Sequence, residues 1–398
     1  MKFNQQGSTL IIVMWAIAII GVVITFMYYR SEAEWASVNS LEQKVRLRRE
    51  ANNILFKCLD LLLEDDTEFD SKKDLWFNGV ARIQSAYNDN NKGYATTIIV
   101  EDEGSKPNLN TIGEKGLKAL GGTAIDPVLD WRDTDDEVRP EGAELSYYQG
   151  LNPAYKPRNG FFSSVEELKL LKDEDKTYPA LAPEVTVYGK INPNVISAET
   201  FSSFLYSLDR FEKMWIERAT DEFRLYREQI RQDKLHFTNI DQFGSSAFTI
   251  DKRDNLKPYF QFQGNHNPNL MSESGLKAVL TDTGYPETLA AELINRREQQ
   301  PFENDSELDI YFKPKKKEIR YPTDYFTTVS TIIRYRIWIS KGNTRFYLDT
   351  VQERRFDRSK KEWRAHPLSW RELFNKEVPD IPKIETEESE ITEDGENE

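Results

Sequence analysis

The chain contains little that would support redox, zinc or nucleophilic chemistry. It has one Cys and three His in 398 residues, and His236, His266 and His366 lie far apart in the sequence. A single Cys excludes an internal disulfide, and this composition excludes Cys-rich zinc clusters and a compact His cluster. Gly-rich phosphate loops, His-Glu-x-x-His helices and Gly-x-Ser-x-Gly elbows are absent as well. We therefore predict that the protein is not an enzyme.

The chain has little excess charge outside its C-terminal end. The net charge is −14, from 53 Lys and Arg against 67 Asp and Glu. Ten acidic residues and a single Lys lie in residues 377–398, so 52 basic residues face 57 acidic ones before them, a net charge of −5. A balanced surface has no bulk affinity for nucleic acid, because counterion release requires clustered Lys and Arg. Residues 377–398 have almost no apolar content, which predicts a disordered tail.

The N-terminal segment lacks charge altogether. No residue from Ser8 to Tyr29 is charged, and a helix of these 22 residues is about 33 Å long, close to the hydrocarbon thickness of a bilayer. A secretory signal peptide would have a shorter apolar core and a small-residue cleavage site, but aromatic residues follow here up to Arg30. We therefore predict a single-pass anchor. Its flanking charges, Lys2 on one side and several Lys and Arg on the other, do not fix its orientation.

Helix breakers are rare after the anchor too. The first Pro is Pro107, and the first Gly after the anchor is Gly79. Apolar residues recur at mostly three- and four-residue intervals, at Trp35, Val38, Leu41, Val45, Leu55, Leu59 and Leu62. This pattern predicts one continuous helix over about 8–63, whose second half docks this stripe on a soluble domain. Cys58 lies near the stripe, and we predict that it is a small buried hydrophobe.

Strand-forming residues gather in three runs that are far apart in the sequence. Residues 94–100 are rich in β-branched side chains, and residues 326–339 and 345–353 flank a turn at Ser340-Lys341-Gly342-Asn343. The two later runs predict a β-hairpin. More than two hundred residues with helical periodicity separate the first run from this hairpin. We expect the distant strands to close one sheet around an inserted helical domain, since a long insertion costs only about a few kcal/mol of loop entropy.

The inserted domain opens with an acidic segment. Its carboxylates lie close together and return after a turn with Pro and Gly, at Asp133, Asp135, Asp136 and Glu144. A hard cation such as calcium binds oxygen ligands that converge from a loop, and the mutual repulsion of these carboxylates favours a cation. The spacing only partly fits an EF-hand, because Glu137 and Val138 stand where that loop requires Asp or Asn and then Gly. The alternative is a solvated acidic turn with Asp130 capping a helix, and the residues alone leave both open.

A short leader that ends at Gly7, followed by an apolar helix that turns amphipathic, resembles a type IV pilin or pseudopilin precursor. The resemblance implies that prepilin peptidase cleaves after Gly7, that Ser8 becomes a methylated N-terminus, and that the leader is cytoplasmic and the remainder periplasmic. Most pilins have Glu at the fifth mature position, where this chain has Ile12. A buried carboxylate without a partner costs about several kcal/mol, so Ile12 indicates a subunit with no neighbour above it, at a filament tip.

Further motifs resemble one family of this superfamily, the K minor pseudopilins of the type II secretion system. They occur in the family's order and comprise Pro107-Asn108-Leu109-Asn110, residues 129–144, residues 157–168 and residues 185–194. The resemblance implies calcium binding, which favours a metal site at Asp133, Asp135, Asp136 and Glu144. It also implies association with the I and J minor pseudopilins.

Residues 267–312 resemble the second helical unit of this family and form a helix-hairpin-helix pattern. In DNA-binding proteins such a hairpin places backbone amides on phosphate, but here Asp282 and Glu287 repel phosphate. Packing is therefore the preferred interpretation of this pattern, and a small basic spot at Arg296 and Arg297 is the alternative.

The sequence predicts an α+β fold: a pilin-like long N-terminal helix packed on a small antiparallel sheet, with a large inserted α-helical domain of the helix-hairpin-helix or SAM-like kind. The expected parts are a leader (1–7), the transmembrane half of the helix (8–29), the amphipathic helix with the first part of the sheet (30–110), the inserted domain (111–315, with units at about 111–205 and 267–312), the C-terminal strands (316–376) and the acidic tail (377–398). The stretch 206–266 departs from the family pattern and is expected to lengthen the helical domain.

These observations together predict a minor pseudopilin at the tip of the type II secretion pseudopilus, a structural component for the export of folded proteins across the outer membrane. The expected partners are other minor pseudopilins of the I and J type, prepilin peptidase and the inner membrane, with calcium bound and no nucleic acid. The alternatives are a minor pilin of a type IV pilus and a membrane-anchored helix-hairpin-helix protein that binds DNA.

Overall fold

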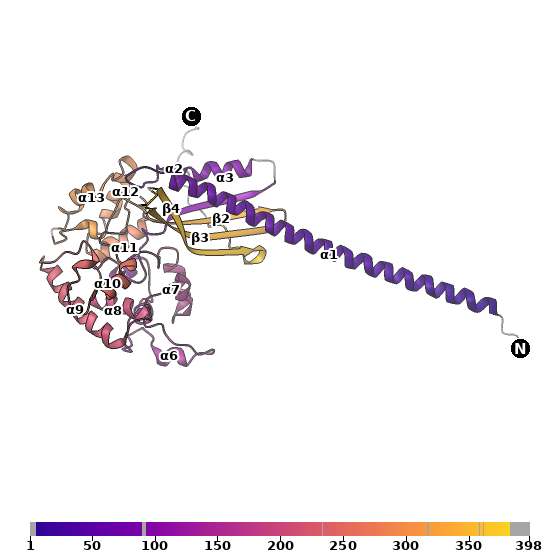
Figure 1. The fold of residues 1–398 in the computed structure, drawn as a ribbon, viewed down its shortest axis with the longest axis horizontal. Coiled ribbons are helices and arrows are strands. Elements are labelled where there is room, and N and C mark those ends of the chain that lie inside the picture. Colours follow the sequence, from indigo (N-terminus) through magenta and orange to yellow (C-terminus); the bar gives the residue numbers. More distant parts are fainter. Residues whose placement is uncertain are drawn as a thin grey trace, which may run out of the picture.

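The computed structural model describes residues 5–89, 93–232, 234–316, 318–357, 359–360 and 362–382. The first four residues of the predicted leader and residues 383–398 of the predicted acidic tail lie outside this part of the chain. A long helix, α1, runs out of a globular head that combines one sheet with many short helices (Figure 1). The predicted α+β fold, a long N-terminal helix packed on a small antiparallel sheet, is confirmed.

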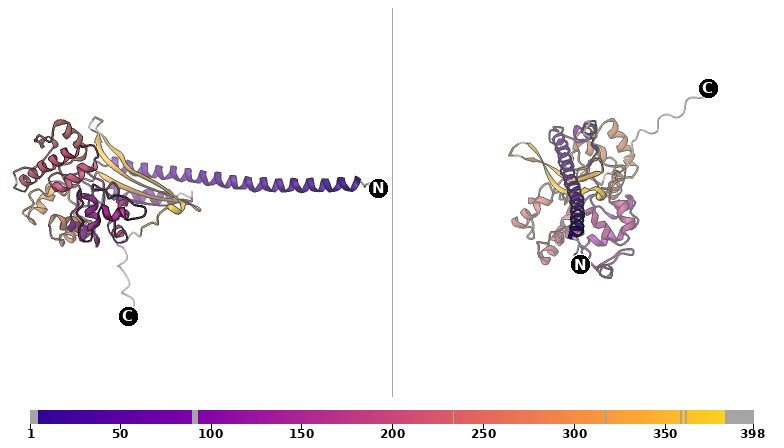
Figure 2. Two further views of the ribbon diagram at one scale, coloured as in Figure 1. Left: turned by 90° about the horizontal axis from the view of Figure 1, so that it is seen from below. Right: turned by 90° about the vertical axis from the view of Figure 1, so that its right-hand side faces the viewer.

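Helix α1 spans Gln5–Leu63 without interruption. This agrees with the continuous helix predicted from the scarcity of Gly and Pro, and its start lies a few residues earlier than expected. The part from Leu10 onward is long and apolar enough to cross a membrane, and its most apolar stretch contacts nothing else in the molecule. Figure 2 shows that this half projects far beyond the head, while the other half lies along the sheet.

The end of the predicted stripe docks on the head and its beginning does not: Leu55 and Leu62 are buried, and Leu59 is partly buried against the same core. The buried residues of the helix are Leu47, Ala51, Ile54, Leu55, Cys58 and Leu62. Four residues of the predicted stripe, Trp35, Val38, Leu41 and Val45, are between 56% and 65% exposed. The prediction that they dock on the soluble domain is wrong, because the head begins near Leu47 and residues two apart on a helix, such as Val45 and Leu47, point in nearly opposite directions. Cys58 is fully buried, as predicted.

The sheet is antiparallel with strand order β1-β2-β3-β4. Its strands are β1 (Ala95–Asp102), β2 (Ile332–Lys341), β3 (Thr344–Asp357) and β4 (Glu362–Phe374). The hairpin between β2 and β3 is confirmed, with Gly342 at positive φ in its two-residue turn. Residues 326–331 precede β2 rather than belonging to it, and β4 was not recognised as a strand because its residues are half exposed and lack a β-branched run. One face of the sheet packs on α1 through Ile98, Tyr335, Ile337 and Leu348.

The two edges of the sheet differ. At β1, the backbone of Thr96 bonds the side chain of Asn88 in both directions, and the Ile98 amide donates to Gln84 Oε1. Asn88 and Gln84 come from α3 (Val80–Asn88), which follows α2 (Leu75–Asn78). These side-chain amides replace a neighbouring strand, so α3 closes this edge. At the other edge, β4 interrupts its own ladder with Pro367 and a bulge.

The inserted helices lie between β1 and β2 in sequence and form the far part of the head (Figure 1). In chain order the α-helices are α4 (Glu114–Ala119), α5 (Asp126–Arg132), α6 (Leu145–Gln149), α7 (Glu174–Leu181), α8 (Ala198–Ser207), α9 (Lys213–Arg231), α10 (Ile250–Leu256), α11 (Glu273–Thr283), α12 (Leu289–Gln299) and α13 (Asp305–Phe312). Short 3₁₀ helices cover Val165–Leu170, Ile240–Gln242, Lys257–Tyr259, Pro322–Asp324 and Asn375–Glu377.

Three separate hydrophobic cores fill the helical part. The first gathers residues between Leu109 and Val185 together with Ala278, the second residues between Ile191 and Phe260, and the third residues between Met271 and Phe326. The predicted first unit, 111–205, therefore ends inside the second core. There α8 and α9 pack together through Phe201 and Phe223, whose ring centroids are 4.2 Å apart. The boundary was misplaced because the sequence does not reveal which helices share a core.

Residues 377–382 were expected to begin the acidic tail, but they contact the sheet. Val378 is buried against Trp338 and Tyr347, and Trp338 Nε1 donates to the Pro379 carbonyl over 3.0 Å. This start of the tail is corrected, because the Val378 side chain and the Pro379 carbonyl find partners on the open face of the sheet.

Candidate metal centre

The acidic loop connects two helices of the first core. Helix α5 ends at Arg132 with Asp133 as its C-cap, and Glu144 is the N-cap of α6. Trp131 anchors the loop from inside: it stacks on Phe162, contacts Tyr148 edge to face and donates from Nε1 to Glu167. Both ends of the loop are thus fixed by buried helical residues, while its middle is exposed.

Asp130 binds the backbone of the loop from its buried side. It is fully buried in α5, and its carboxylate accepts the backbone amides of Arg139 (3.2 Å) and Ala143 (2.9 Å). The Arg139 guanidinium also donates to Asp130 Oδ1 over 2.7 Å. The Asp130 carboxylate therefore organises the loop backbone, and it does not cap a helix as the alternative interpretation of the sequence had it. Gly142 has no room for a side chain, since an added Cβ would lie 1.9 Å from Asp130 Oδ2.

Glu144 is the residue that most clearly lacks a partner. Its side chain is only 2% exposed, and neither carboxylate oxygen has a hydrogen-bond donor. Burial, followed by the negative charges of the four aspartates around it, raises the pKa of Glu144 to about 8. A buried carboxylate in this position is costly unless it is protonated or paired with a cation.

Asp133 is partly satisfied. Its Oδ2 accepts from the Arg139 guanidinium, which thereby bridges Asp130 and Asp133, but its buried Oδ1 has no hydrogen-bond partner. Burial raises the pKa of Asp133 to about 6, against the opposing charge of Arg139. The remaining predicted ligands, Asp135 and Asp136, are exposed, and Asp135 Oδ1 accepts the backbone amide of Glu137.

The four predicted ligands thus lie in one loop, in which the two oxygens of the buried Glu144 have no hydrogen-bond donor. Among the described residues, however, the oxygens of Asp133, Asp135, Asp136 and Glu144 do not form a group in which all lie within 4.8 Å of one another. The donor set consists of carboxylate oxygens, which suits calcium, and the orphaned oxygens of Glu144 and Asp133 are what a cation would satisfy. Of these four carboxylates Arg139 pairs only with Asp133, and its other partner is Asp130.

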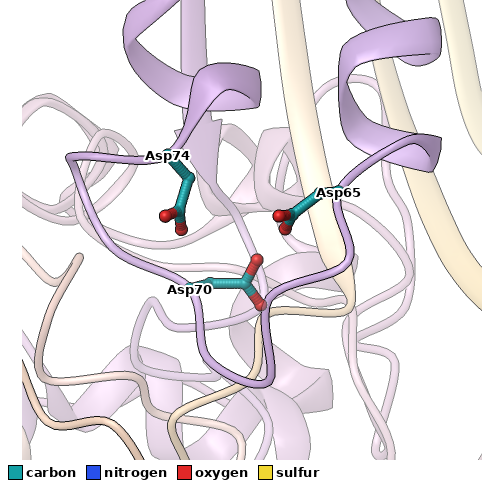
Figure 3. A group of neighbouring side chains, drawn as sticks. All are labelled: Asp65, Asp70 and Asp74. Carbon is teal, nitrogen blue, oxygen red and sulfur yellow. The ribbon is translucent and has the colours of Figure 1, made fainter.

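A second acidic group, which the sequence did not single out, lies where the chain leaves α1. Carboxylate oxygens of Asp65, Asp70 and Asp74 lie within 4.8 Å of one another, and the three side chains point toward a common centre (Figure 3). Asp70 is buried, and burial raises its pKa to about 7. The acidic run around these residues was visible in the sequence, but their convergence depends on the loop after α1.

This second group already contains its counterion. The guanidinium of Arg354 in β3 contacts Asp65 Oδ2 at 3.3 Å and Asp70 Oδ2 at 2.7 Å. Asp70 also accepts from the Trp76 indole and the Ser330 amide, and Asp74 accepts the Ser71 amide. These contacts account for the group as a structural ion-pair network that ties the end of α1 to the sheet.

The helix-hairpin-helix pattern is confirmed as α11, a turn at Gly284, and α12. The two arginines of its basic spot have partners inside the molecule. Arg296 pairs with Glu307 and lies over the Phe302 ring, and Arg297 donates to the carbonyls of Pro268 and Met271. The hairpin itself is covered by Lys316, which donates to the Thr283 carbonyl. This arrangement matches packing rather than phosphate binding.

The two residues of the predicted processing site, Gly7 and Ser8, lie in the first turns of α1. Their position in the helix does not test cleavage, so cleavage between Gly7 and Ser8 stays a prediction.

Comparison with known proteins decides which of the sequence resemblances has independent support. Residues 110–190 match the family model of the type II secretion system protein K. This segment contains the whole acidic loop and most of the first core, and it makes up less than half of the chain. The resemblance to protein K predicted from the sequence is confirmed over this segment. No curated protein matches the chain.

Among solved structures, the chain is similar to the crystal structure of the GspK-GspI-GspJ complex from the enterotoxigenic Escherichia coli type 2 secretion system. The identity is 10%, the TM-score is 0.43, and the alignment covers 84% of this chain and 99% of that chain. A likeness at this TM-score carries no conclusion about the fold, which is established by the contacts within this chain.

Proposed function

We propose that the protein is a minor pseudopilin of the type II secretion system, located at the tip of the pseudopilus, where it serves the export of folded proteins across the outer membrane. The observation that carries this proposal is the match of residues 110–190 to the protein K family. The continuous helix α1, apolar in its first half and docked on a small sheet in its second, supports it. The role is structural, so no catalytic residue is assigned.

The anchor would be processed and inserted as in other pseudopilins. Prepilin peptidase would cleave after Gly7, and Ser8 would carry the methylated N-terminus. The apolar stretch from Leu10 fits a single pass through the inner membrane, with the head on the periplasmic side. Ile12 at the fifth mature position places no carboxylate in the apolar core, which suits the subunit that has no neighbour above it.

The exposed stripe on α1 supports association with other minor pseudopilins of the I and J type. Trp35, Val38 and Leu41 lie between the membrane segment and the head, and Val45 lies at the start of the docked part. All four are on the side of the helix away from the docked face, and nothing in the described residues covers them. Apolar residues at three- and four-residue spacing are the pattern with which helices pack on one another. The helix of a neighbouring subunit would bury this stripe.

Calcium would bind at the acidic loop, with Asp133, Asp135, Asp136 and Glu144 as oxygen ligands. The support is the buried carboxylate of Glu144 without a donor, together with the match of this loop to a family model. Bound calcium would compensate the charges that raise the pKa of Glu144 and would link the end of α5 to the start of α6.

The role in secretion is tested in cells that lack their own copy of the gene. The full chain should restore the appearance of exported proteins in the medium, and a chain with Gly7→Glu, which is designed to block the leader cleavage with a large charged side chain, should not. Restoration by the uncleaved variant would contradict a pseudopilin role. Normal secretion without any copy of the gene would contradict it as well.

The helix contact is tested by cysteine crosslinking. The native Cys58 is buried, so a single introduced cysteine reports its own surroundings. Val38→Cys should crosslink to another minor pseudopilin in membranes, whereas Ser40→Cys, two residues away on another face, should do so much less. Equal crosslinking at both positions would contradict a specific helix contact.

A further inference from the structure

One short motif occurs three times in the helical part, each time at the entrance to a helix pair. The three copies are Asn108-Leu109-Asn110, Asn192-Pro193-Asn194 and Asn267-Pro268-Asn269. In each copy the side-chain oxygen of the first Asn accepts the backbone amide of the second, at 2.9, 3.0 and 3.0 Å respectively. Each motif therefore makes the same side-chain-to-backbone turn before its helix starts.

The second Asn of each motif makes a further contact that is the same in all three copies. Its side-chain amide donates to the carbonyl of a distant Phe and accepts that residue's backbone amide. The pairs are Asn110 with Phe162, Asn194 with Phe237, and Asn269 with Phe302. All three asparagines are at most 4% exposed. In each copy the Asn side-chain amide satisfies both backbone groups of the Phe, as a neighbouring strand would. Because buried polar groups require such partners, finding the same pair of hydrogen bonds three times indicates that the three segments share one structural plan.

An arginine from the second helix of each pair clamps the motif. Arg132 donates to the carbonyls of Leu109 and Ile112, and Arg297 donates to those of Pro268 and Met271, which occupy the same places relative to the motif. Arg227 from α9 donates to the carbonyl of Asn194. The three arginines come from α5, α9 and α12, the helices that follow each hairpin.

The segment after each Phe also repeats. The residue directly after it donates its backbone amide to a Glu or Gln four positions later, in Ser163 to Glu167, Thr238 to Gln242 and Glu303 to Glu307. Ser164, Asn239 and Asn304 stand at the N-caps of the helices that begin there, with φ of −148°, −159° and −158°.

Each stretch is closed on itself by a parallel bridge between its beginning and its end. The bridges join Asn108 to Thr186, Ile191 to Phe260, and His266 to Phe326. The three hydrophobic cores described above fall within these three closed stretches, except for Ala278, which contributes to the first core from the third stretch. In each of the three stretches, a bridge therefore joins the first and last parts of a segment that encloses one hydrophobic core.

We infer that residues 107–328 consist of three copies of one helical unit, over about 107–188, 190–262 and 265–328, and that the middle copy is an added module that is not required for assembly. The last point rests on the proposed function. The proposed metal loop belongs to the first copy, and the junction with the sheet is made by the segment just before the first copy and by the third copy. Ser105 and Asn267 connect there to Asp102 and Ser330.

The middle copy is also the part of the head that carries extra surface of its own. Its second helix, α9, has 19 residues where α12 has 11, and the additional turns bring Trp215 against Phe211 with Lys252 over both rings. In Figure 1, α8, α9 and α10 lie at the end of the head that is remote from the free part of α1. The middle copy is therefore well placed to be gained or lost without disturbing the anchor.

The independence of the copies is tested by hydrogen exchange on the full chain in detergent. Asn194→Ala leaves the backbone groups of Phe237 buried without partners and removes a 3.4 Å contact to Asp324 Oδ1. Amide exchange should therefore accelerate about tenfold or more within 190–262, change locally around Asp324 in the third copy, and stay unchanged elsewhere. Asn110→Ala is the matched control and should accelerate exchange within 107–188 only. Acceleration across all three copies in either variant would overturn the division into units.

Dispensability is tested by deleting residues 191–265, which joins Lys190 to His266. The two ends lie side by side, since Asn265 Nδ2 donates to the Lys190 carbonyl over 3.0 Å. The deleted chain should restore secretion to within about twofold of the full chain. A deleted chain that accumulates in the membrane but fails to support secretion would overturn this part. If the deleted chain does not accumulate, the exchange experiment decides whether the module folds independently.

These outcomes separate the inference from the proposed function. Failure of the full chain to restore secretion would contradict the proposed function, whereas the exchange pattern reports only on the three units and does not depend on secretion.

Discussion

The molecule contains two groups of buried acidic side chains. In one group an arginine compensates the negative charge, and in the other one buried carboxylate has no partner. At the end of α1, Asp65 and Asp70 share the guanidinium of Arg354, and Asp70 accepts further hydrogen bonds. In the acidic loop, Arg139 pairs with Asp130 and Asp133, but both oxygens of the buried Glu144 have no donor. The comparison shows that acidic clustering alone does not indicate a metal site, and that an unpaired buried carboxylate is the more informative feature.

The largest expected effect concerns the group with the internal counterion. Arg354→Met leaves Asp65 and Asp70 without their positive partner in a buried place, and we expect the free energy of unfolding to fall by about 3–5 kcal/mol. Urea denaturation of the purified chain measures this. Arg355→Met is the control, since its side chain is 55% exposed and pairs only with Glu353, and it should change stability by less than about 0.5 kcal/mol. If calcium restored the stability of Arg354→Met, this group would be a metal site after all.

The next effect concerns calcium at the acidic loop. Free calcium at about one hundred times its dissociation constant should stabilise the folded chain by about 2.7 kcal/mol, and a chelator should reverse this. Differential scanning calorimetry with and without calcium measures the shift in melting temperature. Asp133→Ala should abolish the shift, whereas Asp175→Ala, which removes the same charge from α7, should preserve it. A melting temperature that is the same with and without calcium would refute the metal centre.

A smaller effect concerns the pH dependence of the metal-free chain. The pKa of Glu144 is raised to about 8 in the folded state, so the folded chain binds this proton more tightly than the unfolded chain does. Its contribution is fully present below about pH 4.5 and is lost as pH rises through about 8. Glu144→Gln should therefore stabilise the metal-free chain on the order of 1–2 kcal/mol at about pH 8.

Urea denaturation at several pH values, in chelator, measures the difference between Glu144→Gln and the unmodified chain. Asp70, with its pKa raised to about 7, shifts stability in the same direction, but it is present in both chains and cancels. A difference that does not grow between about pH 5 and about pH 8 would mean that Glu144 is paired in the metal-free state.

The smallest expected effect concerns the exposed ligands. Asp135→Asn should leave the stability of the metal-free chain within about 0.5 kcal/mol, because the side chain is exposed. It should weaken calcium binding about several-fold, because it removes one charged oxygen ligand. Isothermal titration with calcium measures this, and unchanged affinity would exclude Asp135 from the ligand set.

The long helix and the hairpin could be predicted because their causes are local. The apolar run without charge and the scarcity of Gly and Pro are sufficient for α1, and two strand-forming runs around a Gly-Asn turn are sufficient for β2 and β3. The docked face of α1 could not be predicted, since both Val45 and Leu47 are apolar and only the position of the head selects one of them. β4 was missed for a similar reason, because its residues depend on β3 for their conformation.

The candidate site was predictable in its residues but not in its electrostatics. The spacing of Asp133, Asp135, Asp136 and Glu144 indicated oxygen ligands, while the burial of Glu144 and the bridge made by Arg139 depend on tertiary packing. The three helical copies were equally hidden. They share a few asparagine and arginine contacts across long and unequal loops, and such contacts become recognisable only when the partners are known.

The free stretch of α1 has a mechanical consequence. From Arg30 to Glu42 every side chain of the helix is exposed, and the first hydrogen bond between the helix and the head joins Thr344 to Gln43. At a rise of about 1.5 Å per residue, this stretch is about 20 Å long. In the proposed anchor it acts as a stalk that separates the head from the membrane surface.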